Sequence, residues 1–98
     1  MITSFRDGWL EAFFQSNQKA KELPASIERQ LFRRLQMLDD AACGLDLRSP
    51  PSNHFEKLSG SLSGRHSIRV NLQWRIISEF DDGTGQAFNV YLDPHTYR

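Results

Sequence analysis

The stretch HSIRVNLQWRIISEF, residues 66–80, decides the fold, because it reads as two strands joined by a tight turn. Apolar and polar residues alternate over residues 66–70 and again over residues 73–80, as they do in half-buried strands. Asn71 and Leu72 form the connection between the two strands. A connection this short forces the strands to pair in antiparallel fashion.

Short strands also flank this hairpin on both sides. On the C-terminal side, residues 81–85 form a second turn and residues 87–92 form the last strand. On the N-terminal side, residues 55–58 form a short strand, and the turn-rich residues 59–64 link it to the hairpin. Consecutive strands joined by short turns pair antiparallel, so the sequence predicts a small antiparallel sheet.

Two amphipathic helices precede the strands. Helical spacing of apolar residues predicts a first helix that ends near Gln18 and a second that begins near Pro24 and ends at Gly44. A short first strand is expected at residues 1–5, and an ordered loop at residues 46–53, where two prolines remove backbone donors. The apolar stripes of the helices consist of Trp9, Leu10, Phe13 and Phe14, and of Ile27, Leu31, Leu35 and Leu38. The fold class is therefore α+β, with two N-terminal helices packed on one face of the sheet.

Length and composition indicate one domain in a reducing compartment. The 98 residues have room for a single domain over residues 1–98, and 39% hydrophobic residues with eleven aromatic ones suffice for a core. No apolar run approaches the roughly 18 residues that span a membrane, and the N-terminus lacks the layout of a signal peptide. Cys43 is the only cysteine, so neither a disulfide nor a cysteine-based zinc site can form. These features predict a cytoplasmic protein with no membrane partner.

Positive charge is concentrated in one part of an otherwise neutral chain. Twelve basic residues balance twelve acidic ones, so the whole chain has no field that draws it to nucleic acid. Between residues 48 and 75, however, a single acid, Glu56, accompanies five basic residues. These five are Arg48, Lys57, Arg65, Arg69 and Arg75. We expect Arg69, Gln73 and Arg75 to project from the open face of the sheet, because residues two apart share a side.

Four segments of the chain resemble, in order and spacing, the signature of HigB-type toxins, which belong to the RelE/ParE superfamily of type II toxin–antitoxin systems. These segments are Asp46–Pro51, Phe55–Gly60, His66–Asn71 and Gln73–Ile76. The resemblance implies a RelE-like fold similar to that of microbial ribonucleases and a ribosome-dependent endoribonuclease activity on mRNA, with no cofactor. It also implies a HigA-like helix-turn-helix antitoxin as partner, in a hetero-oligomer that binds operator DNA.

The end of the chain departs from the pattern of this family. Members typically have an Asp-Tyr-His triplet after the last strand, whereas this chain has Asp93, Pro94 and His95. Asp93 and His95 match the triplet as they stand, but Pro94 has no hydroxyl group. Tyr97 follows three residues after Pro94. A catalytically weak toxin that binds ribosomes or RNA and inhibits by occupancy is therefore an alternative to the enzyme.

Cleavage of RNA without a metal assigns three tasks to side chains. The 2′-hydroxyl must lose a proton, the pentavalent phosphate must be neutralised, and the leaving 5′-oxygen must be protonated. Arg75 is the candidate phosphate clamp, because a guanidinium stays charged and can bridge two oxygens; the alternative is a surface arginine that pairs with Glu79. His95 is the candidate acid or base, and Asp93 can orient it from the same side of an extended chain.

The remaining basic residues of the positive stretch are expected to bind phosphates of messenger or ribosomal RNA. They are Arg48, Lys57, Arg65 and Arg69, and the alternative for each is solvated surface charge. Trp74 is expected in the core, and His54 and His66 stay outside the catalytic set. The sequence has no glycine-rich phosphate loop, no histidine pair at metal-ligand spacing and no nucleophile elbow, so no metal is expected.

A third interpretation is a non-enzymatic module whose two helices dock the antitoxin. Such docking is compatible with every version of the toxin, so it does not by itself separate the hypotheses. One experiment separates the module from the enzyme. If the protein is a non-enzymatic module, replacement of Arg75 by alanine would leave the growth arrest that it causes unchanged.

Overall fold

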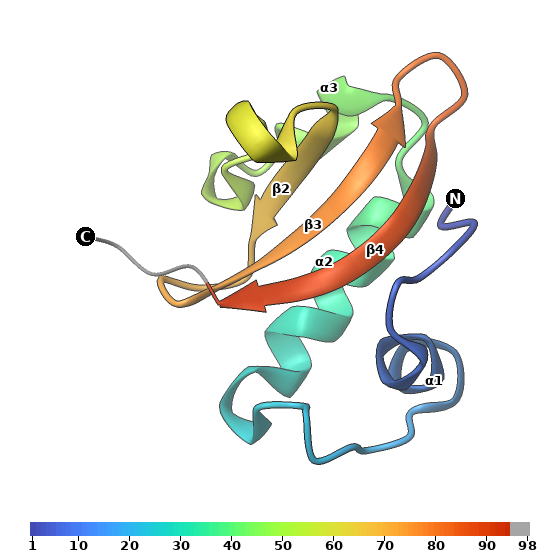
Figure 1. Cartoon of the computed structure of the whole chain (residues 1–98), viewed down its shortest axis with the longest axis vertical. Helices are drawn as coiled ribbons and strands as arrows, with labels where there is room; N and C mark the ends of the chain where they lie inside the picture. The colour runs from blue at the N-terminus through green and yellow to red at the C-terminus, as the bar shows by residue number, and fades with distance from the viewer. Residues whose placement is uncertain (95–98) are drawn as a thin grey trace.

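The α-helices precede the strands in the computed structural model, which describes residues 1–94 (Figure 1). The α-helices are α1 (Gly8–Ser16), α2 (Glu28–Asp40) and α3 (Gly44–Leu47), and the short 3-10 helices are η1 (Ala25–Ile27), η2 (Pro51–Asn53) and η3 (Gly60–Leu62). The strands are β1 (Glu56–Lys57), β2 (Arg65–Arg69), β3 (Trp74–Asp81) and β4 (Gln86–Pro94). None of the helices in this described part is long and apolar enough to cross a membrane.

The four strands form one sheet in the order β1-β2-β3-β4, and every neighbouring pair is antiparallel. The α+β fold class and the antiparallel sheet predicted from the sequence are thus confirmed. In the hairpin formed by β2 and β3, Arg65 lies opposite Glu79, and Arg69 lies opposite Arg75. Figure 1 shows α2 crossing one face of the sheet, with α1 beside it. The opposite face, called the open face below, is not crossed by α1 or α2 (Figure 1). On it, Ser67, Ile77 and Tyr91 are nevertheless buried, whereas Arg69 and Arg75 are partly exposed.

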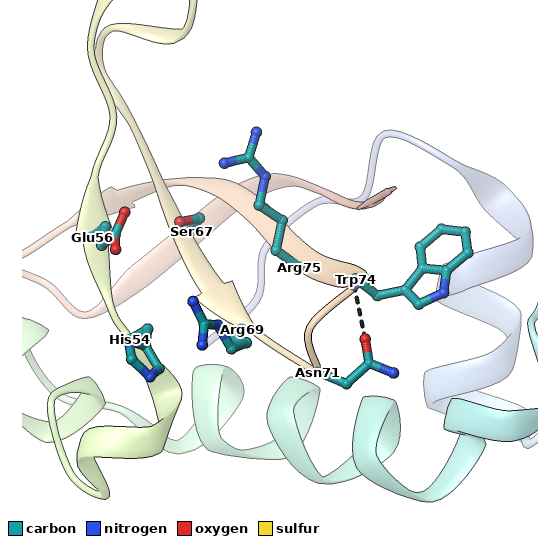
Figure 2. Close-up of a pocket in the computed structure, with 7 residues that line it drawn as sticks. All are labelled: His54, Glu56, Ser67, Arg69, Asn71, Trp74 and Arg75. Carbon is teal, nitrogen blue, oxygen red and sulfur yellow. Dashed lines mark hydrogen bonds between the residues drawn. The ribbon is translucent and has the colours of Figure 1, made fainter. Parts of the chain in front are cut away.

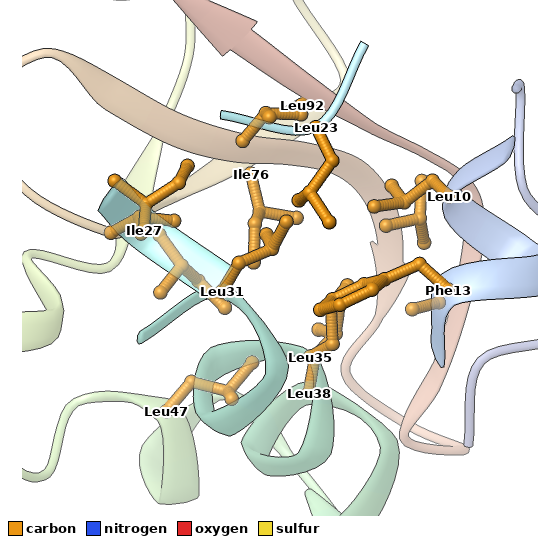
Figure 3. Close-up of a cluster of buried hydrophobic side chains, with 14 of the residues drawn as sticks. Leu10, Phe13, Leu23, Ile27, Leu31, Leu35, Leu38, Leu47, Ile76 and Leu92 are labelled. Atoms are coloured by element: carbon orange, nitrogen blue, oxygen red, sulfur yellow. The ribbon is translucent and has the colours of Figure 1, made fainter. Parts of the chain in front are cut away.

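The core lies between the sheet and the two long helices (Figure 3). Leu31, Leu35 and Leu38 are fully buried, because their spacing places them on the side of α2 that faces the strands. The side chains packed around them include Leu10, Phe13, Ile68, Ile76, Val90 and Leu92. Each fully buried side chain of this size contributes about 1.5–3 kcal/mol relative to exposure. Trp74 is partly buried against this cluster, as predicted.

The second helix ends earlier than predicted, and the prediction that Gly44 terminates it is wrong. α2 ends at Asp40, and Ala41 already has an extended backbone with φ −66° and ψ 131°. The cause is close packing against the β3–β4 turn, where Gly85 has φ +72°. A Cβ atom on Gly85 would lie 2.7 Å from the carbonyl oxygen of Ala41 and 2.6 Å from that of Ala42. These oxygens therefore face the turn, and Gly44 begins α3 instead.

The N-terminal residues lie along β4 but do not form the regular strand predicted for residues 1–5. They make two isolated parallel bridges with β4, from Ile2 to Ala87 and from Phe5 to Val90. Between the bridges, Asn89 has a left-handed backbone with φ 54°, and its N–H donates to Ser4 Oγ over 2.9 Å. The pairing of β4 with β3 also shifts register at this place. Such a bulge interrupts the pairing, which explains why the segment is bridged but irregular.

Candidate functional site

A pocket opens on the uncovered face of the sheet, at the turn that joins β2 to β3 (Figure 2). Its walls consist of His54, Glu56, Ser67, Arg69, Asn71, Trp74 and Arg75. Arg69 and Arg75 are directly opposite each other on the two strands. Like charges in opposed positions of a sheet repel and lower stability, and an anion bound beside both would relieve that repulsion. The pocket thus presents two guanidinium groups and the carboxylate of Glu56 on one face of the sheet.

Arg75 is held by an ion pair with Asp93 of β4. The two residues are opposite each other in the β3–β4 register, and Arg75 Nε donates to Asp93 Oδ2 over 3.1 Å. Their side chains are only 20% and 31% exposed. The bond through Nε leaves the two terminal amino groups of the guanidinium available for the oxygens of a phosphate. Glu79 accepts a hydrogen bond from Asn89 instead, so the alternative pairing of Arg75 with Glu79 is wrong.

The structure thus brings together two of the three residues predicted to be catalytic. Arg75 and Asp93 are in direct contact. His95, the third, lies outside the described residues, as does Tyr97. The predicted action of Asp93 on His95 stays a prediction.

The β2–β3 turn fixes the separation of the two pocket arginines. Asn71 Oδ1 accepts hydrogen bonds from the backbone N–H groups of Gln73, over 2.8 Å, and of Trp74, over 2.9 Å. From α2, Arg34 Nε donates to the carbonyl oxygen of Arg69 over 3.2 Å. Because β3 begins at Trp74, Gln73 belongs to the turn and does not line the pocket. Strand alternation therefore does not place it beside Arg69 and Arg75, and its projection from the open face stays a prediction.

His54 lines the pocket, although its sequence context did not predict a place for it in the catalytic set. It follows η2 with a left-handed backbone, φ 44°, which turns the chain toward β1. The preceding Asn53 is fully buried, and its Nδ2 donates to the carbonyl oxygen of Leu47 over 3.1 Å. This anchor presents the imidazole to the pocket, where the carboxylate of Glu56 also lies (Figure 2). The paired prolines were the only sequence signal that this loop is ordered.

The other predicted RNA-binding residues lie elsewhere. Lys57 is opposite His66 in the β1–β2 register, so its side chain points away from the open face. Arg48 and Lys57 line a separate groove together with His66. Arg65 is at the first position of β2, at the opposite end of that strand from Arg69. Of these four basic residues, only Arg69 lines the pocket, and RNA binding by the others stays a prediction.

His66 packs among aromatic rings in the separate groove. Its imidazole stacks on Phe55, with ring centroids 5.1 Å apart and an angle of 6° between the planes. Its Nδ1 is buried and has no hydrogen-bond partner among the described residues. Burial lowers the pKa of His66 below its ordinary value; the nearby charge of Lys57 lowers it further, and that of Asp82 raises it in part.

We expect the free energy of unfolding to fall as the pH drops below about 6.5, the ordinary pKa of histidine. His66 stays neutral in the folded protein while the unfolded chain takes up a proton. Its contribution is therefore complete above the unfolded pKa and is lost progressively as the pH falls toward the lowered folded pKa. Urea unfolding at a series of pH values measures this slope. The variant His66→Phe keeps a ring against Phe55 and should show a flatter profile; an unchanged slope would contradict the assignment.

The pocket holds the kinds of groups needed to act on a phosphodiester. Two guanidinium groups can neutralise charge on phosphate oxygens, while an imidazole and a carboxylate can exchange protons. Within residues 1–94, no group of three or more His, Cys, Asp or Glu side chains is arranged to hold a metal ion.

Comparisons with known proteins identify the family that this chain resembles. Residues 3–95 match the family described as the RelE-like toxin of the type II toxin–antitoxin system HigB. Toxin HigB-1 of Vibrio cholerae serotype O1 is 50% identical over 97 residues, which are 99% of this chain and 100% of that protein. An uncharacterised protein of Haemophilus influenzae is 38% identical over 93 residues, which are 95% of this chain and 90% of that protein.

A likeness among solved structures concerns the fold alone. The YoeB-YefM complex from Staphylococcus aureus matches with a TM-score of 0.53 and 19% sequence identity. The match covers 99% of this chain and 97% of that chain. The arrangement of helices and sheet described above is therefore also found in this solved complex.

Proposed function

The chain belongs to the HigB-like family of RelE-like toxins from type II toxin–antitoxin systems, and from this premise we propose that it cleaves messenger RNA on the ribosome. Cleavage of messages would inhibit translation and growth. The observation that carries the proposal is the opposed pair Arg69 and Arg75 in an open pocket shared with His54 and Glu56. Such a pocket supplies positive charge and proton-exchanging groups at one phosphate.

In the proposed reaction, the 2′-oxygen of the ribose attacks its own phosphate. The bond between the 2′-oxygen and phosphorus forms and the bond between phosphorus and the 5′-oxygen breaks, which gives a 2′,3′-cyclic phosphate and a 5′-hydroxyl. A base removes the proton of the 2′-hydroxyl, and an acid donates a proton to the leaving 5′-oxygen. Arg69 and Arg75 bind the other phosphate oxygens and neutralise the charge that develops on them.

Three side chains are proposed for the two proton transfers. His54 and Glu56 line the pocket, and His95 is the candidate from the sequence. Asp93 acts on the reaction through Arg75, because their ion pair fixes the direction of the guanidinium. We therefore assign Asp93 a positioning role, in addition to the role predicted for it beside His95.

The ribosome would supply most of the binding energy in this proposal. The chain has no net charge, which gives weak attraction to free RNA. Weak attraction is sufficient when the ribosome presents the message, because orientation of the reacting groups can lower a barrier by about 7 kcal/mol or more. The neutral charge thus fits an enzyme that acts on ribosome-bound messages.

A partner antitoxin is also part of the proposal. The Staphylococcus aureus structure with the same fold was solved as a complex of YoeB with YefM. By analogy and from the family, we propose a HigA-like helix-turn-helix antitoxin for this chain, in a hetero-oligomer that binds operator DNA. A short helix-turn-helix protein encoded directly downstream of this chain would support this partner.

The cleavage proposal is tested by incubating the purified protein with translating ribosomes and mapping the 5′ ends of the messages. New ends in phase with the codons support cleavage. Stalled but intact messages support inhibition by occupancy, which Pro94 favours, because it brings no hydroxyl to the end of β4. Messages that are neither cut nor stalled would contradict both forms of the proposal.

A further inference from the structure

A second cationic cluster lies on the open face, at the other end of β2 from the pocket. Arg65 Nη1 donates to the hydroxyl of Tyr91 over 3.3 Å. The guanidinium carbon of Arg6 lies 3.6 Å from the centroid of the Tyr91 ring, and that of Arg65 lies 5.9 Å from it. Tyr91 is only 5% exposed beneath these two side chains. We refer to Arg6, Tyr91 and Arg65 as the Tyr91 cluster.

The positive charge of the Tyr91 cluster is poorly compensated by acids. As far as residues 1–94 are concerned, Arg65 takes part in no ion pair, and Arg6 pairs only with its neighbour Asp7, over 3.2 Å. That ion pair is exposed, and exposed pairs of this kind contribute little. Glu79, the acid opposite Arg65 on β3, forms a hydrogen bond with Asn89 instead. Within residues 1–94, two arginines thus contact one ring, and only one of them, Arg6, forms an ion pair with a carboxylate.

The Tyr91 side chain contacts both arginines, because the Arg6 guanidinium lies over the ring and Arg65 donates to the hydroxyl. A guanidinium that lies over an aromatic ring keeps its N–H groups in the plane and directs them outward, where they can form paired hydrogen bonds with a phosphate. Tyr91 is opposite Ile77 on β3, and Ser67 is also opposite Ile77, so the cluster and the pocket share one face. Arg65 and Arg69 are four residues apart on β2, a separation of about 13 Å along the strand.

We propose that the Tyr91 cluster is a second phosphate-binding subsite, which holds the backbone of a single-stranded RNA whose scissile phosphate lies in the pocket. The inference rests on the proposed function, since it presupposes an RNA substrate. It adds that recognition extends along the open face beyond the nucleotides at the cleaved bond. A longer RNA would then bind more tightly than one that fills the pocket alone.

The subsite is tested by measuring the affinity of the purified protein for a labelled single-stranded RNA of about 12 nucleotides, within the usual size range of such sites. Arg6→Gln and Arg65→Gln should each weaken binding roughly tenfold at low salt, as expected for loss of a charge-assisted hydrogen bond. The slope of log affinity against log salt should become shallower by about 0.7 for each phosphate that the variant no longer binds. Competition by a dinucleotide, which occupies the pocket alone, should be unchanged.

Three further variants make the result specific. Arg29→Gln removes the same charge from an exposed position of α2 and should change neither affinity nor salt slope. Tyr91→Phe keeps the ring but removes the acceptor of the Arg65 hydrogen bond, so its affinity should fall between those of Arg65→Gln and the parent. Arg65→Lys keeps the positive charge but cannot form the paired hydrogen bonds of a guanidinium, so it should lower affinity while retaining most of the salt slope.

Parent-like affinity and slope in Arg6→Gln and Arg65→Gln would overturn the inference and leave the Tyr91 cluster as a structural feature of the sheet. Arg6 is 53% exposed in its side chain, so Arg6→Gln should fold normally, and its thermal unfolding checks this. Failure of the proposed function would look different. The parent protein would then leave messages on ribosomes uncut and unstalled, whatever the binding of the variants to free RNA.

Discussion

Replacement of Arg75 by alanine is expected to lower the rate of mRNA cleavage on ribosomes by about 10²–10³-fold, the usual effect of removing one group that stabilises a developing oxyanion. Arg75 is opposite Arg69 in the β2–β3 register, and its terminal amino groups are available for phosphate oxygens. Single-turnover cleavage of a ribosome-bound message measures the effect. The loss should appear in the rate at saturating protein, because in the proposed function the ribosome provides most of the binding.

The controls for Arg75 separate charge, geometry and stability. Arg75→Lys keeps the positive charge but cannot form the paired hydrogen bonds of a guanidinium, so its rate should lie only slightly above that of Arg75→Ala. Asp93→Asn weakens the ion pair that positions Arg75, so it should lower the rate less than Arg75→Ala does. Arg29→Ala, on the exposed side of α2, should be neutral in both cleavage and unfolding. Growth arrest that persists unchanged in a folded Arg75→Ala variant would contradict the enzyme and favour the non-enzymatic module.

Replacement of Gly85 by alanine is expected to lower the free energy of unfolding by about 2–5 kcal/mol. Gly85 has a left-handed backbone, φ +72°, which by itself is strained for alanine by about 1–2 kcal/mol. The added methyl group would also lie within 2.7 Å of the carbonyl oxygens of Ala41 and Ala42, and forcing such a close approach costs about 1–3 kcal/mol more. Urea unfolding monitored by tryptophan fluorescence measures the loss.

Gly60 provides the matched control, since it has a similar backbone, φ +68°, but no atom within 4 Å of an added Cβ. Gly60→Ala should therefore show the backbone strain alone, about 1–2 kcal/mol. The difference between the two variants isolates the close approach of the β3–β4 turn to the end of α2. Equal losses of unfolding free energy in Gly60→Ala and Gly85→Ala would show that this close approach does not affect stability.

The sequence predicted those parts of the fold that depend on periodicity. The spacing of Leu31, Leu35 and Leu38 predicted α2, and alternation along residues 66–80 predicted the central hairpin. Features set by tertiary packing were missed. α2 stops at Asp40 because of the turn at Gly85, which lies far away in the sequence. α3 is only four residues long, too short for a periodic pattern to show.

The sequence predicted which residues belong to the site better than it predicted how they are arranged. Arg75 and Asp93 were both named, but their ion pair depends on the β3–β4 register, which no local pattern fixes. Lys57 was grouped with Arg69 because both belong to the same basic stretch, although strand alternation turns Lys57 to the other face. His54 reaches the pocket through a left-handed backbone, which is uncommon outside glycine and which its sequence context does not reveal.

The segment that precedes α1 has a consequence for the behaviour of the free protein in solution. Hydrogen bonds from residues 1–6 occupy the outer side of β4, while the other outer strand, β1, is only two residues long. Unpaired strand edges are templates on which further copies of a chain can add, and this is how many sheets begin to aggregate. One edge of the sheet is occupied and the other is short, so the sheet offers little unpaired backbone for such growth. We therefore expect the free protein to resist self-association into insoluble material.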